Sequence, residues 1–292
     1  MTTEIMQVAE SEEKSSFSIS KLFTEYRALP VLMGLLGLVI FFAFQNEVFL
    51  SSRNLSNVLV QTVVIGTISL GLVFILLQGE IDLSVAAVSG VTSVMMAQMV
   101  VKLGSELWLA NAAAVCSSSL IGAVTGWWVT KFRGPSFVVT LGMGLSLNGL
   151  QLFLLPTSGS INLLGTGVEI ISGEFLTGLW SWGVLVISVA LVGGLTLSRY
   201  ARYFKAGVET SILKVFVGPT AGALVLGAAL VAALNGSQGV PVPVVIFGAL
   251  LGIASYVLTE TRFGLHVYAT GGNVEAARRA GISVSRVKIT AF

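Results

Sequence analysis

Residues 58–77 read VLVQTVVIGTISLGLVFILL, twenty residues without a charged side chain. A helix crosses the hydrocarbon core of a bilayer in about 20 predominantly apolar residues, so this stretch predicts a membrane span. Seven further apolar segments repeat the pattern, at residues 28–44, 83–101, 107–129, 136–155, 176–197, 212–234 and 242–258. We therefore expect an all-α, polytopic membrane protein with about eight transmembrane helices.

Helices are the expected form of these segments because backbone groups inside a bilayer must be hydrogen-bonded within the segment. A transmembrane β-barrel would show shorter runs that alternate apolar and polar residues, and these runs do not alternate. Charged residues are 10% of the 292 residues, against about 25% in soluble domains. This composition excludes a secreted, disordered or nucleic-acid-binding protein, and the net charge of +2 indicates no polyanionic partner.

Catalytic and metal chemistry find little support in the sequence. Cys116 is the only cysteine and His266 the only histidine, so we expect no intrachain disulfide and no cysteine or multi-histidine metal site. The sequence also lacks a GxxxxGK[ST] phosphate loop and any Ser/His or His/Asp/Glu cluster typical of an active site. We expect the chain not to be an enzyme and to bind no metal or cofactor itself.

Lysine and arginine residues predict the orientation. If the N-terminus is cytoplasmic and eight spans alternate, fourteen of the sixteen basic residues fall on the cytoplasmic side, as the positive-inside rule requires. They are Lys14, Lys21, Arg27, Lys131, Arg133, Arg199, Arg202, Lys205, Lys214, Arg262, Arg278, Arg279, Arg286 and Lys288, which leaves Arg53 and Lys102 outside. We expect a cytoplasmic N-terminal tail at 1–27, a transmembrane domain at 28–258, and a cytoplasmic segment with the C-terminus at 259–292.

A polar break, QGEIDLS at residues 78–84, separates the second and third apolar segments. A charge at mid-bilayer costs about 2.5–3.5 kcal/mol on insertion scales, so the break must line water or packed protein. In one interpretation Asp82 caps the following helix at the cytoplasmic face. In the other the break lines a solute path or gate, for which the candidate residues are Gln78, Glu80, Asp82, Ser84 and, on the fifth segment, Asn148. A hydrogen bond between helices is the alternative role for Asn148.

Three glycine pairs have the GxxxG spacing typical of close helix contacts, namely Gly122/Gly126, Gly218/Gly222 and Gly248/Gly252. With 33 glycines among 292 residues, chance alone gives about four such pairs. These pairs therefore carry no information about helix contacts.

After residue 258 the sequence turns polar and basic, and it carries the signals of a short helix. In order these are Gly271-Gly272 for a sharp turn, Asn273 as N-cap, Glu275 in the first turn, strong helix formers at 276–280, and Gly281 after the last turn. Such a helix carries Arg278 and Arg279 but little bulky apolar surface. A docking element for a cytoplasmic partner therefore explains it better than a helix lying on the membrane.

Four stretches, in this order, carry a family resemblance: RNLSN at 53–57, GEIDLSV at 79–85, GPSFVVTLG at 134–142, and the segment from Phe263 to Lys288 that contains YATGGNVEAARRAGI. The last three resemble the GxIDLSVG signature, the PxFIVTLG stretch and the GxxxYAxGGNxEAARxxGI coupling segment. All four occur in this order in the membrane-spanning permease subunits that the chain resembles, those of ATP-binding-cassette sugar importers of the ribose and xylose group. The match to the coupling segment is the most specific. Residues 212–234 followed by GVPVP at 239–243 are similar to the extra membrane stretch and GIPVP motif of the xylose-type permeases.

This resemblance implies a permease subunit in the cell membrane of a prokaryote that moves a monosaccharide, xylose or a related sugar. It implies an extracytoplasmic sugar-binding protein, a second permease copy, and cytoplasmic ATP-binding subunits that use ATP and Mg. The residues it assigns to coupling with the ATPase are Gly272, Asn273, Glu275, Ala276, Ala277, Arg278 and Gly281.

The sequence departs from the family pattern in three ways. Ala86-Ala87 replace a glycine-containing pair, and Asn148 stands where these permeases often have arginine. Members of the family also continue beyond the coupling segment with further membrane helices, so the transmembrane domain is expected to be truncated at Phe292. The alternatives are a related permease for branched-chain amino acids or nucleosides, and an ion-coupled secondary transporter.

Overall fold

The computed structural model describes residues 29–132 and 134–292, which fall into two units divided at Leu55. The N-terminal tail expected at 1–27, with Lys14, Lys21 and Arg27, lies outside the described residues, as does Arg133.

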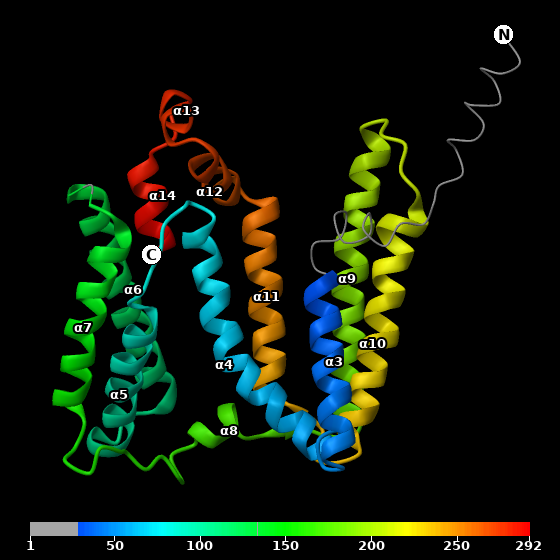
Figure 1. The fold of residues 1–292 in the computed structure, drawn as a ribbon, viewed down its shortest axis with the longest axis horizontal. Coiled ribbons are helices and arrows are strands. Elements are labelled where there is room, and N and C mark those ends of the chain that lie inside the picture. The colour runs from blue at the N-terminus through cyan, green and yellow to red at the C-terminus, as the bar shows by residue number, and fades with distance from the viewer. Residues whose placement is uncertain (1–28, 133) are drawn as a thin grey trace, which may run out of the picture. The chain divides into compact units, whose positions relative to one another are not determined.

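Eight apolar helices occupy the eight predicted segments of the described chain (Figure 1). Seven are long and apolar enough to cross a membrane: α4 (Ser52–Leu76), α5 (Val85–Leu103), α6 (Leu107–Phe132), α7 (Ser136–Leu154), α9 (Leu179–Lys205), the continuous π-helix η1 (Leu213–Val217) with α10 (Gly218–Asn235), and α11 (Val242–Glu260). The eighth, α3 (Leu29–Gln45), has 17 residues, which is the lower limit for a span. The prediction of a helical, multi-pass membrane protein is confirmed, while the side that each end faces stays a prediction.

Two short elements interrupt the helical pattern before α9 and α11. Strand β1 (Phe175–Leu176) pairs antiparallel with β2 (Val240–Pro241), so residues of the predicted GVPVP motif hold the start of α11 beside the start of α9. A Cβ atom on Gly239 would overlap the carbonyl oxygen of Leu176, and Gly239 has a φ of +92°, so only glycine fits this approach.

The helix α8 (Val168–Ser172) lies in the connection from α7 to α9. Backbone N–H groups of Glu169 itself and of Gly165 hold the pKa of the Glu169 carboxyl below its usual 4.5. The carboxylate thereby closes the turn that precedes this short helix.

The closest packing between long helices within residues 56–292 is in two groups. Helix α5 packs against α6 and α7, with Ala87, Val91 and Leu147 in a buried cluster. Helix α9 packs against α10, where the Ser181 hydroxyl donates to the Asn235 side-chain oxygen at 3.0 Å. Outside these contacts most large apolar side chains of the spans are exposed, as expected for helices surrounded by lipid.

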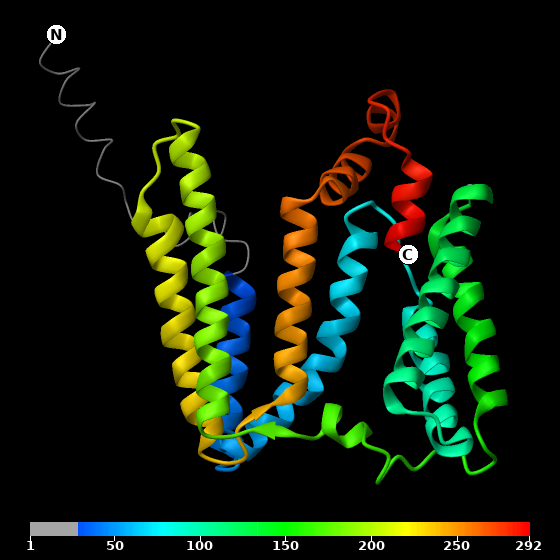
Figure 2. The same cartoon turned by 180° about the vertical axis from the view of Figure 1, so that it is seen from behind.

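The C-terminal segment contains three helices where the sequence predicted one. They are α12 (Arg262–Gly272), α13 (Val274–Arg279) and α14 (Val284–Ala291), which follow α11 from orange to red in Figures 1 and 2. Thr261 begins α12, because its hydroxyl oxygen accepts a hydrogen bond from the Gly264 N–H at 3.3 Å. Helix α13 is the predicted short helix, whereas α12 and α14 were not predicted.

Candidate functional site

The break at 78–84 begins where α4 ends. The N–H groups of Gln78 and Gly79 bond the carbonyls of Ile75 and Leu76 at 3.0 and 2.9 Å, and Gly79 has a φ of +74°. This left-handed residue turns the chain out of the helix, which is a common use of glycine at a helix end.

Helix α7 supplies the polar partners that the break needs. The Ile81 N–H donates to the Ser136 hydroxyl oxygen, and the Leu83 N–H donates to the Thr140 hydroxyl oxygen, both at 3.0 Å. The Thr140 hydroxyl also donates to the Ile81 carbonyl at 3.2 Å. Ser136 and Thr140 are buried, so these bonds satisfy backbone groups that water does not reach. The GEIDLSV and GPSFVVTLG motifs are thus joined to each other by hydrogen bonds.

Asp82 organises the start of α5. One carboxylate oxygen accepts hydrogen bonds from the Ser84 N–H at 2.7 Å and from the Ser84 hydroxyl at 2.6 Å. The N-cap residue is the buried Ser84, two positions after the residue that the capping interpretation named. Asp82 acts through Ser84, and its negative charge lies near the positive end of the helix.

The other two polar residues of the break differ in their partners. Glu80 forms an ion pair with Lys288 of α14, and the two side chains are only 16% and 17% exposed. Gln78 is buried, and its side-chain nitrogen donates to the Phe74 carbonyl at 3.0 Å. Its side-chain oxygen has no hydrogen-bond partner among the described residues.

Helix α12 meets the break through its last turn. A Cβ atom on Gly271 would overlap the carbonyl oxygen of Leu77 and lie 3.3 Å from the Gln78 Cα. The prediction of a sharp turn at Gly271-Gly272 is wrong, because both residues are helical and neither has a positive φ. Gly271 instead gives the room for α12 to approach the end of α4.

The predicted caps of α13 are confirmed. The Asn273 side-chain oxygen accepts a hydrogen bond from the Ala276 N–H at 2.9 Å. At the other end Gly281 has a φ of +83°, its N–H bonds the Arg278 carbonyl, and the Ile282 N–H bonds the Ala277 carbonyl, both at 3.0 Å. This pair of bonds is the Schellman motif that ends a helix at glycine.

The exposed side of α13 is charged. Glu275 and Arg278 form an ion pair of 2.6 Å while remaining 66% and 60% exposed, and Arg279 and Ala276 are exposed beside them. Ala277 is buried, so it packs inward and gives a partner no contact surface. The arrangement presents a short helix, capped at both ends, with its three charged side chains exposed.

Helix α14 packs on α6 at a glycine pair whose spacing by itself carried no information about contacts. A Cβ atom on Gly126 would lie 2.9 Å from the Ile289 Cα, and one on Gly122 would overlap the Phe292 carbonyl oxygen. Gly222, Gly248 and Gly252 have no such neighbour within 4 Å. One of the three GxxxG pairs is therefore a real helix contact, and it holds α14 within the length of a predicted span. The cytoplasmic placement of 259–292 stays a prediction.

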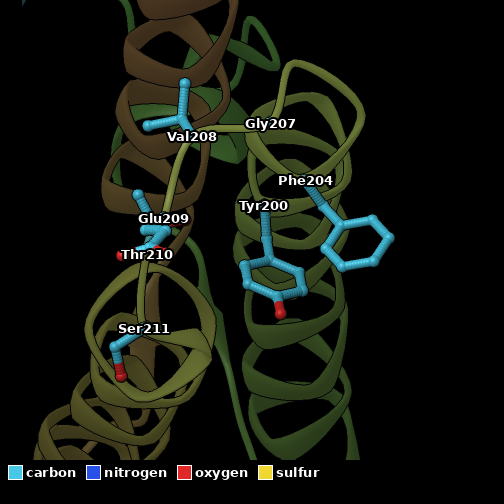
Figure 3. Close-up of a pocket in the computed structure, with 7 residues that line it drawn as sticks. All are labelled: Tyr200, Phe204, Gly207, Val208, Glu209, Thr210 and Ser211. Atoms are coloured by element: carbon cyan, nitrogen blue, oxygen red, sulfur yellow. The ribbon is translucent and has the colours of Figure 1, made fainter.

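Two clefts accompany these elements. One, of about 510 Å³, opens beside the Glu80–Lys288 pair and is lined also by Thr130, Pro135, Arg278 and Ser285. The other, of about 550 Å³, lies between Tyr200 and Phe204 on α9 and the loop at 207–211 (Figure 3). Only the first is built from the sequence motifs.

Asn148 is not among the α7 residues that contact the break. It is exposed, whereas Ser136, Thr140 and Gly144, which face the break, are buried. The sequence reasoning missed Ser136, Thr140, Gly271 and Lys288. The sequence signal for them was weak. Two hydroxyl residues four positions apart in an apolar helix, or a lysine in a basic segment, do not indicate which distant residue they contact.

Residues 54–292 match the family model described as the permease component of the branched-chain amino acid transport system. The chain belongs to this permease family. It is 33% identical to the xylose transport system permease protein XylH of Escherichia coli K12 over 269 residues, which cover 90% of this chain and 67% of the relative. It is 31% identical to XylH of Haemophilus influenzae, covering 90% and 71%, and 29% identical to the ribose import permease RbsC of E. coli K12, covering 89% and 63%. No solved structure matches the chain significantly.

Family membership makes the chain a multi-pass membrane component of an ATP-binding-cassette sugar importer of the xylose and ribose type. It is a permease and not itself an enzyme, and ATP hydrolysis belongs to a separate ATPase partner. A binding-protein partner is implied by the same membership.

Proposed function

We propose that this chain carries xylose or a related monosaccharide across the cell membrane, driven by ATPase subunits that dock on α13. The observation that carries the proposal is the contact of the C-terminal segment with the break and the residue just before it, at Gly271–Leu77 and Glu80–Lys288. Through it, a pull on α13 reaches the junction of α4 and α5. Alternating access then follows, because a displaced break shifts the two helices that it joins.

The choice of a sugar rests on the relatives. Two xylose permeases are 33% and 31% identical, and a ribose permease is 29% identical. The GVPVP residues, which form β2 and begin α11, support the xylose type. We place the N-terminus and residues 259–292 in the cytoplasm, with a sugar-binding protein on the other face and a second permease copy alongside.

Their contacts divide the candidate path residues into those that position the break and those that can contact the solute. Glu80 and Asp82 have partners inside the protein, so we assign them to positioning the break rather than to binding the sugar. Gln78 has a buried side-chain oxygen that is open for a hydrogen bond, and we place it with Asn148 as the candidates for contact with the solute.

Uptake by the reconstituted transporter tests the substrate. Proteoliposomes that contain the permease with its ATPase and binding proteins should take up labelled D-xylose or D-ribose in the presence of ATP. Transport of L-leucine or uridine instead would favour the related permeases for amino acids or nucleosides. Uptake that needs no ATP and stops when ion gradients are dissipated would identify a secondary transporter.

Glu275→Arg tests the docking of α13. The substitution places a third positive charge beside Arg278 and Arg279 and removes an exposed ion pair, so we expect uptake to fall at least tenfold with membrane levels unchanged. Glu106→Arg, on another exposed glutamate just before α6, is the matched control and should transport normally. Unchanged uptake in Glu275→Arg would reject the coupling role of α13.

A further inference from the structure

We propose that the Glu80–Lys288 ion pair is the positioning contact through which the C-terminal segment moves the break at 78–84. The proposal rests on the proposed function and adds the residues that transmit the motion. Glu80 and Lys288 are 208 positions apart in the sequence, and their side chains are 16% and 17% exposed.

The break is held from two sides by different kinds of contact. Its backbone bonds α7, through Ile81 with Ser136 and Leu83 with Thr140. Its Glu80 side chain instead reaches α14. The break therefore bridges α7 and α14, and the ion pair is the polar side-chain contact on the α14 side.

The C-terminal segment can pass a displacement to this pair because its helices are closely connected. The Schellman bonds hold Gly281 and Ile282 against the end of α13, and α14 begins two residues later at Val284. Helix α14 is then seated on Gly122 and Gly126 of α6. A movement of α13 thus reaches Leu77, just before the break, through the close contact with Gly271, and it reaches Glu80 through the ion pair with Lys288.

Partial burial increases the energetic effect of losing one charge of this pair. Exposed ion pairs contribute little to stability. Removing one partner of a buried pair is costly, because it leaves the other charge unpaired in the protein interior, where water solvates it poorly. For a pair buried to this extent, we expect the loss of one charge to raise the equilibrium constant for local opening of the break about tenfold.

The test uses the complete transporter with its ATPase and binding proteins. The variants are Lys288→Met, Glu80→Gln, the exchange Glu80→Lys with Lys288→Glu, and the conservative Lys288→Arg. Glu106→Gln and Lys102→Met are matched controls on exposed side chains. The first readout is hydrogen exchange of the 77–84 amides. The second is the ratio of ATPase activity with and without binding protein loaded with D-xylose or D-ribose.

In Lys288→Met and Glu80→Gln we expect exchange at 77–84 to rise about tenfold, the ATPase ratio to fall toward one, and the KM for ATP to stay unchanged. Lys288→Arg and the exchanged pair should restore both readouts, which a purely structural defect would not do. If hydrogen exchange at 77–84 is unchanged in Lys288→Met and Glu80→Gln, the proposal is overturned, whatever the effect on transport. Raised exchange with a normal ATPase ratio overturns it as well. If the unaltered transporter shows no sugar-stimulated ATPase activity, the proposed function fails, while hydrogen exchange still decides whether the pair holds the break.

Discussion

Gly271 and Gly272 are adjacent in sequence but differ in what surrounds them. A Cβ atom on Gly271 would collide with the Leu77 carbonyl, whereas one on Gly272 would have nothing within 4 Å. We predict that Gly271→Ala destabilises the protein by about 1–3 kcal/mol, because backbone has to move. Gly272→Ala should be neutral or stabilising by up to about 1 kcal/mol, since alanine favours the helix. Thermal unfolding in detergent measures both, and equal midpoints would contradict the contact.

The Thr140 hydroxyl makes two hydrogen bonds to the backbone of the break. Thr140→Val keeps the shape but leaves the Leu83 N–H and the Ile81 carbonyl without that partner, so we expect a cost of about 1–3 kcal/mol. Hydrogen exchange at 81–84 should increase accordingly. Thr92→Val, whose buried hydroxyl bonds only carbonyls of its own helix, is the control and should change little. Similar exchange in both variants would show that Thr140 does not hold the break.

The residues that could be predicted from the sequence are those whose signals are local. Asn273 and Gly281 cap α13 by bonding atoms a few positions away, so their roles follow from residue type and spacing. Glu80 was recognised as notable but not its partner, because Lys288 is brought to it only by the folded chain. Contacts between distant segments leave no periodic trace in a single sequence.

At the scale of elements, the seat of α14 on α6 makes a testable contact. Gly126→Leu should force α14 away from α6, because the nearest atom is the Ile289 backbone, and overpacking of this kind costs about 1–3 kcal/mol. We expect the amides of 284–291 to lose protection from hydrogen exchange. Gly252→Leu, at a position of α11 with nothing within 4 Å, should leave them protected. Equal protection in the two variants would contradict the seat.

Hydropathy predicted the spans but not the short helices that follow them. The eight apolar segments could be located because lipid requires long apolar helices. Helices α12 and α14 mix polar and apolar residues, and α14 has only eight residues, so neither has the length or composition of a span. Their positions depend on packing against α11 and α6, which a single sequence does not display.

For the whole molecule, the central claim is that α13 is where the permease receives the work of ATP hydrolysis. The helix is capped at both ends, charged on its outer side and followed by α14, which contacts the break. Family membership supplies a separate ATPase as the partner that could bind this exposed, charged surface.

Native mass spectrometry of the permease, purified in mild detergent from its host membranes, tests this claim most directly. We predict that the permease is detected with an ATPase subunit bound, and that Glu275→Arg releases the ATPase while Glu106→Arg retains it. A permease that carries no ATPase, or one that holds it equally well with Glu275→Arg, would contradict the account.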